Sequence, residues 1–143
     1  FKNDAEAGDP RYTSKVVERA DTTTYDGLQS NLAVSVWSGA YDPIAIVRNE
    51  ELVLLKAEAN IGKGGDGLTE INAVRTAHGL AAASTGGIDQ LLHEKRYSLF
   101  MEGHRWVDMR RYGKTAALPN DRSDRGDKVF DSFPLPEAET KGK

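Results

Sequence analysis

Hydrophobic residues recur at helical spacing over most of the chain after residue 45. Residues 46–61 place leucine, isoleucine and valine on one stripe and are rich in Leu, Ala, Glu and Lys, which favour helix. The glycine-rich link 62–67 stops this helix, and a second helix is predicted from Leu68 to the C-cap-like Gly79. Two helices across a tight link predict a helical hairpin of the tetratricopeptide-like kind.

Two further helices follow this hairpin. A third helix is predicted over 88–102, with Gly103 as its breaker, and a short fourth helix carries Trp106 and Met109. The proline-containing tail 133–136 is predicted to be extended. The pattern therefore indicates a mainly α fold: a tetratricopeptide-like helical hairpin plus further helices, with long irregular loops.

The first 43 residues show a different pattern. Turn-forming pairs such as Asp9-Pro10 and Asp26-Gly27 recur, and the run Thr22-Thr-Thr24 disfavours helix. Only residues 32–37 are compatible with a short strand. We expect 1–43 to be an irregular, loop-rich lead-in with candidate ligand loops, and 44–143 to form one helical domain.

Composition excludes several classes of function. The net charge of −3 over 143 residues does not favour nucleic acid or an anionic membrane surface. The absence of cysteine excludes disulfides, thiolate catalysis and cysteine-ligated zinc. No run of about 18 apolar residues is present, so no membrane span is predicted.

Residues 94–113 mix charged side chains with aromatic and aliphatic ones around Gly103. Because an unpaired buried charge costs several kcal/mol, we interpret this stretch as a helix–glycine–helix corner whose charges pair within the protein. Arg105 is the expected hub, since its planar guanidinium can bind two carboxylates. The alternative, a catalytic acid–base cluster, is less favoured because paired charges perturb pKa values without catalysis. The predicted structural network comprises Glu58, Arg96, Glu102, Arg105 and Asp108.

Two groups of residues invite a metal interpretation, and neither is favoured. The three histidines, at positions 78, 93 and 104, include no pair at i, i+4, and a hydrogen bond from His104 to Asp108 is the simpler expectation. Calcium could engage Asp121, Asp124 and Asp127, but their spacing is not that of an EF-hand and basic neighbours oppose a cation. We predict a solvated loop there, no metal site and no cofactor.

The aromatic residues of the lead-in suggest a binding role. Sugar faces stack on flat aromatic rings, and sugar hydroxyls need flanking amides and acids. Trp37 and Tyr41, with Asn31 and Asp42 close by in the sequence, have this composition. Core packing is the competing interpretation for Trp37.

Four blocks of residues carry a family resemblance, in a fixed order along the chain. They are Ala57-Glu-Ala59, Ile71-Asn-Ala-Val-Arg75, Glu102-Gly-His-Arg105 with Asp108-Met-Arg-Arg111, and Phe133-Pro-Leu-Pro-Glu137. Over roughly residues 44–137 the chain resembles the C-terminal region of the SusD/RagB family of nutrient-binding outer-membrane lipoproteins, with Asp9-Pro-Arg11 a weaker match upstream. It departs from the family pattern at Glu50, Ala77, Lys95 and Ser98.

The resemblance implies a non-enzymatic role. Such proteins lie on the outer face of the outer membrane, tethered by a lipid, and pass an oligosaccharide or peptide ligand to a TonB-dependent, SusC-like transporter. The family's N-terminal helical-repeat region and lipid-bearing cysteine are not in this chain, so we expect it to be a piece of a longer protein. The alternative is a structural or protein-interaction subunit that uses the same helical fold without glycan binding.

Overall fold

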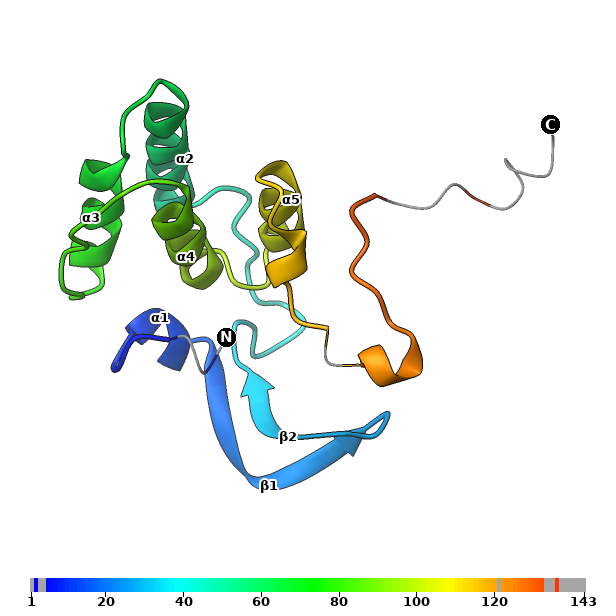
Figure 1. The fold of residues 1–143 in the computed structure, drawn as a ribbon. Coiled ribbons are helices and arrows are strands. Elements are labelled where there is room, and N and C mark those ends of the chain that lie inside the picture. The colour runs from blue at the N-terminus through cyan, green and yellow to red at the C-terminus, as the bar shows by residue number, and fades with distance from the viewer. Residues whose placement is uncertain (1, 3–4, 121, 133–135, 137–143) are drawn as a thin grey trace. The chain divides into compact units, whose positions relative to one another are not determined.

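The structure is a computed structural model that describes residues 2, 5–120, 122–132 and 136 (Figure 1). The described part is mainly helical, as the hydrophobic pattern predicts. Its elements are α1 (Pro10–Thr13), β1 (Val16–Tyr25), β2 (Leu28–Val34), α2 (Asn49–Gly62), α3 (Leu68–Ala77), α4 (Ile88–Ser98) and α5 (His104–Arg111), with short 3-10 turns at Thr115–Ala117 and Ser123–Arg125.

The chain divides into two compact units, Phe1–His104 and Arg105–Lys143. The expected boundary at residue 43 stays a prediction. Within the first unit, the segment before β1 is tied to α3 and α4 by buried ion pairs. The predicted extended tail 133–136 lies outside the described residues, apart from Pro136.

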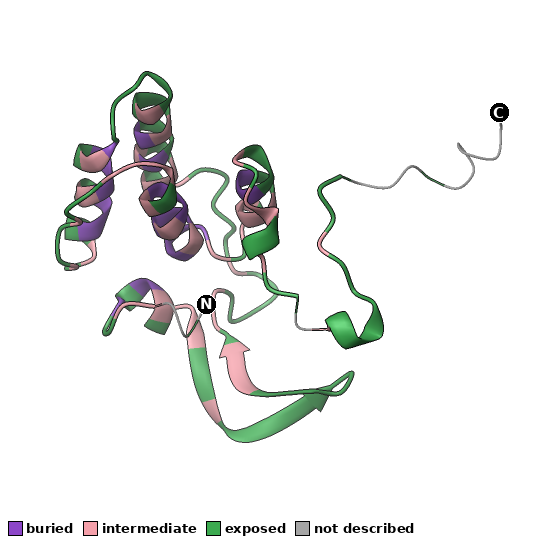
Figure 2. Ribbon diagram, viewed as in Figure 1, coloured by how far each residue is buried: buried purple, intermediate pink, exposed green. Residues whose placement is uncertain are grey.

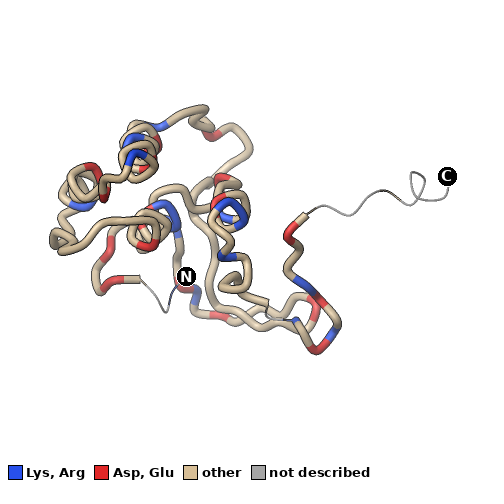
Figure 3. The backbone as a smooth tube through the Cα atoms, turned by 45° about the horizontal axis from the view of Figure 1, so that its top comes forward, with Lys and Arg blue, Asp and Glu red and all other residues tan. Residues whose placement is uncertain are grey.

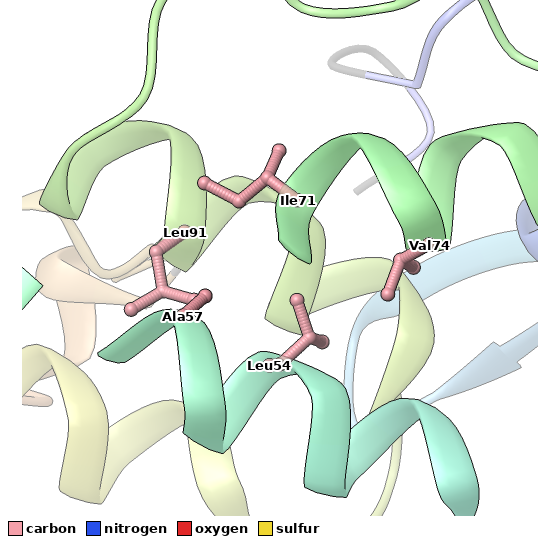
Figure 4. Packing of buried hydrophobic residues seen from close by; sticks show 5 residues of the cluster. All are labelled: Leu54, Ala57, Ile71, Val74 and Leu91. Carbon is pink, nitrogen blue, oxygen red and sulfur yellow. The ribbon is translucent and has the colours of Figure 1, made fainter. Parts of the chain in front are cut away.

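The core of the first unit lies between α2, α3 and α4. It consists of Leu54 and Ala57 from α2, Ile71 and Val74 from α3, and Leu91 from α4 (Figure 4). Residues three apart on a helix share a face, which is why each of α2 and α3 contributes a pair. All five side chains are at most 3% exposed, and Figure 2 shows buried residues along the facing sides of these helices. Burying one aliphatic side chain of this size contributes about 1.5–3 kcal/mol.

The predicted end of the second helix is confirmed. After α3, Gly79 has a φ of +68°, which favours glycine. The N–H of Gly79 donates to the carbonyl of Thr76 and the N–H of Leu80 to that of Arg75, both at 3.0 Å. This is the Schellman arrangement, in which a left-handed residue satisfies two carbonyls at the helix end.

The third helix is shorter than predicted, since α4 ends at Ser98 rather than at Glu102. Its terminal carbonyls are bound by cations instead of by the next turn of helix. The ammonium of Lys15 donates to the carbonyls of Tyr97 and Ser98 at 2.6 and 2.8 Å, and the guanidinium of Arg48 also donates to Ser98. Positive charge at a helix C-terminus is favourable because of the helix dipole.

The expectation of an irregular lead-in is wrong for residues 16–34, which form an antiparallel hairpin of β1 and β2. Asp26 and Gly27 connect the strands, and both have positive φ, as a type I′ turn requires. The expected strand at 32–37 overlaps only the end of β2. The threonine run that disfavours helix also favours strand, because β-branched side chains fit a pleated surface.

Candidate functional site

The two aromatic residues of the predicted binding site are both at the surface. Trp37 is 39% exposed and Tyr41 is fully exposed, in the segment that leads from β2 to α2. The interpretation of Trp37 as a core residue is therefore not supported. An exposed ring with a free face can stack on the apolar face of a sugar.

Asp42 organises the loop between these aromatics. Its carboxylate accepts hydrogen bonds from the hydroxyl of Ser38 at 2.9 Å and from the N–H groups of Ser38 and Gly39. Together these bonds lower the pKa of Asp42, with the bond from the Ser38 N–H the largest cause. Asp42 thus holds the turn Ser38–Asp42 in one conformation.

Asn31 links the two strands of the hairpin through its side chain. Its side-chain amide donates to the carboxylate of Glu18 on the opposite strand at 2.8 Å. This bond is the main cause of a lowered pKa for Glu18.

The aromatic segment is exposed at the surface of the first unit. A mainly apolar cavity of about 170 Å³ lies elsewhere in the first unit, at the base of the hairpin. It is lined by Lys2, Tyr12, Val16, Leu32, Ala33, Val34 and Phe100. None of the four predicted ligand contacts belongs to this lining, so the aromatics and the cavity are separate features.

A buried chain of alternating charges is the main polar feature of the first unit. The guanidinium of Arg11 binds Asp9 at 2.8 Å and Glu94 at 2.5 Å. Glu94 in turn binds Arg75 at 2.7 Å, and Arg75 binds Glu6 at 2.6 Å. The side chains of Asp9, Arg11 and Glu94 are at most 1% exposed. The chain joins the residues before β1 to α3 and α4.

Electrostatic interactions within this cluster favour the charged forms of Glu6, Asp9 and Arg11. Burial alone would raise the pKa of Asp9, but hydrogen bonds from Arg11 outweigh it and the pKa is lowered. For Arg11, burial opposes the charged form, while bonds to Asp9 and Glu94 raise its pKa overall. The bond from Arg75 lowers the pKa of Glu6. Charges that satisfy one another in this way are structural, since none is left to transfer a proton.

The predicted ion-pair residues are found in separate contacts. Glu58 binds Lys95 at 2.7 Å, and Glu102 binds Arg48. Arg105 and Asp108 belong to the second unit, where Asp108 is buried. Arg105 as the hub of one network therefore stays a prediction, as does a role for Arg96.

Sequence reasoning missed Asp9, Arg11, Arg75 and Glu94 as the buried network. The triplet Asp9-Pro10-Arg11 was the available signal, because an Asp two residues before an Arg at a helix start can cap the helix and bind the guanidinium. Figure 3 shows acidic and basic residues interspersed along the described chain, which does not single out this cluster.

Each of the three histidines lies near a glutamate. Nε2 of His78 is 2.8 Å from Glu50, and those of His93 and His104 are 3.7 Å from Glu6 and Glu51 respectively. The predicted bond from His104 to Asp108 stays a prediction.

One group of described residues has the spacing of metal ligands: Glu6, His93 and Glu94, whose ligand atoms lie within 4.8 Å of one another. Arg75 already binds both carboxylates, so a guanidinium occupies the place of a cation. The predicted solvated loop remains the interpretation for the aspartates near residue 124: Asp121 lies outside the described residues, and Asp127 is 3.8 Å from Arg122.

In the second unit, Trp106 has a structural role. Its indole N–H donates to the carbonyl of Phe130 at 2.7 Å, and the guanidinium of Arg110 lies 5.7 Å from its ring centroid. Arg110 also donates to the carbonyl of Asp131. These contacts, a cation–π contact and an indole hydrogen bond among them, tie α5 to the segment 130–131.

Comparison with known families confirms the resemblance seen in the motifs. The model of the SusD family (SusD_RagB) matches residues 29–142, and the chain belongs to this family. The SusD/RagB family consists generally of non-catalytic binding proteins associated with the outer membrane. No curated protein and no solved structure matches the chain significantly. None of the helices in the described residues has both the length and the apolar character of a membrane span.

Proposed function

We propose that the chain is part of a non-catalytic cell-surface protein that binds a nutrient, most simply a glycan or oligosaccharide. Membership of the SusD family over residues 29–142 is the observation that carries this proposal. The partner is a TonB-dependent, SusC-like transporter in the outer membrane, to which the protein passes its ligand. A lipid anchor outside this chain holds the protein at the extracellular face.

The ligand contacts are Trp37 and Tyr41, supported by Asp42 and Asn31. The exposure of both rings supports this assignment, because a sugar needs an accessible aromatic face. The ordered turn from Ser38 to Asp42 supports it further, since a loop held by its own hydrogen bonds loses less conformational freedom on binding. A peptide ligand would use the same rings.

The pair α2–α3 is proposed as a tetratricopeptide-like hairpin that contributes the helical surface facing the transporter. Figure 1 shows the chain reversing direction between these helices, and their facing sides supply most of the core. Leu52 and Leu55 remain exposed on α2, where they offer apolar contacts to another protein surface.

Affinity electrophoresis through gels that contain single polysaccharides tests the proposal. We expect one glycan to retard the chain, and the variants Trp37→Ala and Tyr41→Ala to lose most of that retardation. Tyr25→Ala is the matched control, because Tyr25 is 86% exposed but lies at the turn of the hairpin. Equal loss in the control variant would refute the assigned site.

The second candidate function is a structural or protein-interaction subunit. The exposed hairpin favours it, since an isolated pair of strands gains stability from a further surface. Free migration of the folded chain through every gel, together with a stable protein complex, would favour this alternative over nutrient binding.

A further inference from the structure

The hairpin of β1 and β2 has two open edges. Each strand has only the other as a neighbour, so the outer edge of each meets no other strand among the described residues. Val17, Tyr25 and Leu28 are 45%, 86% and 49% exposed. A two-stranded sheet is marginally stable in water and presents unpaired backbone groups that can template another strand.

The middle of β1 is paired irregularly with β2, as in a β-bulge. The register joins Glu18 to Leu32 and then Thr23 to Ser30, which leaves residues 19–22 without partners in β2. These four residues lie within the bounds of β1. On the outer edge of β1, the N–H and C=O groups that point away from β2 meet no other strand among the described residues, so a further strand can be added along this edge.

Two charged side chains in this middle segment lack ionic partners. Arg19 donates to the hydroxyl of Thr23 at 2.6 Å and to the carbonyl of Ser30 at 3.1 Å, but its Nε is buried without a hydrogen bond. Within the described residues, no carboxylate pairs with Arg19 and no cation pairs with Asp21. Arg19 and Asp21 lie two residues apart, on the same face of the strand.

We propose that β1 pairs in antiparallel fashion with β1 of a second copy of this chain, about a two-fold axis at Ala20. In this register Arg19 lies opposite Asp21 of the partner subunit, and Asp21 lies opposite Arg19 of the partner subunit. The flanking pairs are Val17 with Thr23 and Val16 with Thr24, which are β-branched pairs that suit an antiparallel sheet.

Charge complementarity selects this register among its neighbours. An axis at Arg19 or at Asp21 sets like charges directly opposite each other, and an axis between Arg19 and Ala20 sets Glu18 opposite Asp21 of the partner subunit. An axis between Ala20 and Asp21 forms no charge pair. The axis at Ala20 forms two opposite-charge pairs over residues 16–24 and no like-charge pair, which favours a second copy over an arbitrary strand.

A single cysteine tests the axis, because the chain has no cysteine of its own. Residues directly opposite in an antiparallel pair have Cα atoms about 4.5–5.5 Å apart, within disulfide range. We expect Ala20→Cys to give a covalent dimer under mild oxidation. Thr24→Cys is the matched control: its two thiols would lie eight residues apart along the strand, or roughly 26 Å, and should not cross-link.

Charge reversal tests the pairing itself in the full chain. Sedimentation velocity should show a dimer that Asp21→Arg weakens about tenfold or more, because it sets two pairs of arginines opposite each other. Adding Arg19→Asp to that variant restores opposite charges in the same register and should restore the dimer. Circular dichroism confirms that each variant is folded. A wild type that stays monomeric, a double variant no better than the single one, or equal cross-linking of both cysteine variants would overturn the proposal.

Discussion

Breaking the buried contact between Arg11 and Asp9 should destabilise the first unit strongly, and replacing Arg11 by Met tests this. The guanidinium makes bonds of 2.8–3.2 Å to both oxygens of Asp9 and one of 2.5 Å to Glu94. Met keeps much of the volume and removes every one of these donors. Glu94 would retain Arg75 and Gln90, each at 2.7 Å, whereas Asp9 would lose the guanidinium that satisfies it.

The expected loss of stability in Arg11→Met follows from the burial of Asp9. The side chain of Asp9 is fully buried, and breaking a buried ion pair by removing one partner costs about 3–5 kcal/mol. Domains of ordinary size have a free energy of unfolding of about 5–15 kcal/mol, so the variant should lose a large share of its stability. Adding Asp9→Asn removes the orphaned charge, and Asn still caps α1, so the double variant should be more stable than Arg11→Met alone.

Urea unfolding at neutral pH measures both effects, with an unchanged m value showing that the two-state comparison holds. Lys2→Met is the matched control, because Lys2 and Glu18 form a half-exposed pair at 3.6 Å that should contribute at most about 1 kcal/mol. If Arg11→Met loses no more stability than Lys2→Met, or if Asp9→Asn brings no recovery, the penalty of an orphaned buried charge at Asp9 is refuted.

Two further predictions concern the loss of stability at low pH and the close contact of Gly86 with the backbone of Asp66. In the folded state the pKa values of Glu6 and Asp9 are lowered from 4.5 and 3.8, so the unfolded chain binds protons more tightly than the folded one. The contribution of these two carboxylates to the free energy of unfolding is therefore complete above about pH 5. It is lost as the pH falls through their pKa values in the folded state. Urea midpoints between pH 6 and pH 3 should fall less steeply for Glu6→Gln than for the wild type, and equal slopes would contradict this. A Cβ at Gly86 would lie 2.2 Å from the carbonyl oxygen of Asp66, so Gly86→Ala should cost about 1–3 kcal/mol in thermal or urea unfolding. Gly62→Ala, which meets no atom within 4 Å, should be neutral or slightly stabilising, and similar losses in both variants would argue against the steric reason.

The helices were predictable because their causes are local. The leucine-rich spacing of α2 and the C-cap at Gly79 are properties of short segments, and both are seen in the structure. The end of α4 was not predictable in this way, because it depends on Lys15 and Arg48, which are distant in sequence. The β1–β2 hairpin was missed although Asp26-Gly27 is a strong turn signal, since the flanking strands are mostly exposed and show little hydrophobic alternation.

For the candidate site, too, some properties were predictable from the sequence and others depend on the fold. The sequence by itself determined the family, through ordered motifs, and named Trp37 and Tyr41 from their type and neighbours. Only the tertiary structure decided that both rings are exposed and that Asn31 binds Glu18. The tertiary structure likewise decided which acidic side chain forms an ion pair with which basic one.

Local preferences act over a few residues, so they can be read along the chain. Arg11 and Glu94 are 83 positions apart, and no pattern in either segment specifies the other. A guanidinium binds whichever carboxylate the packing of the helices brings within reach, and burial then makes that choice costly to change. The sequence therefore determined the helices and the motifs, and the packing of α3 and α4 against the segment before β1 determined the ionic centre.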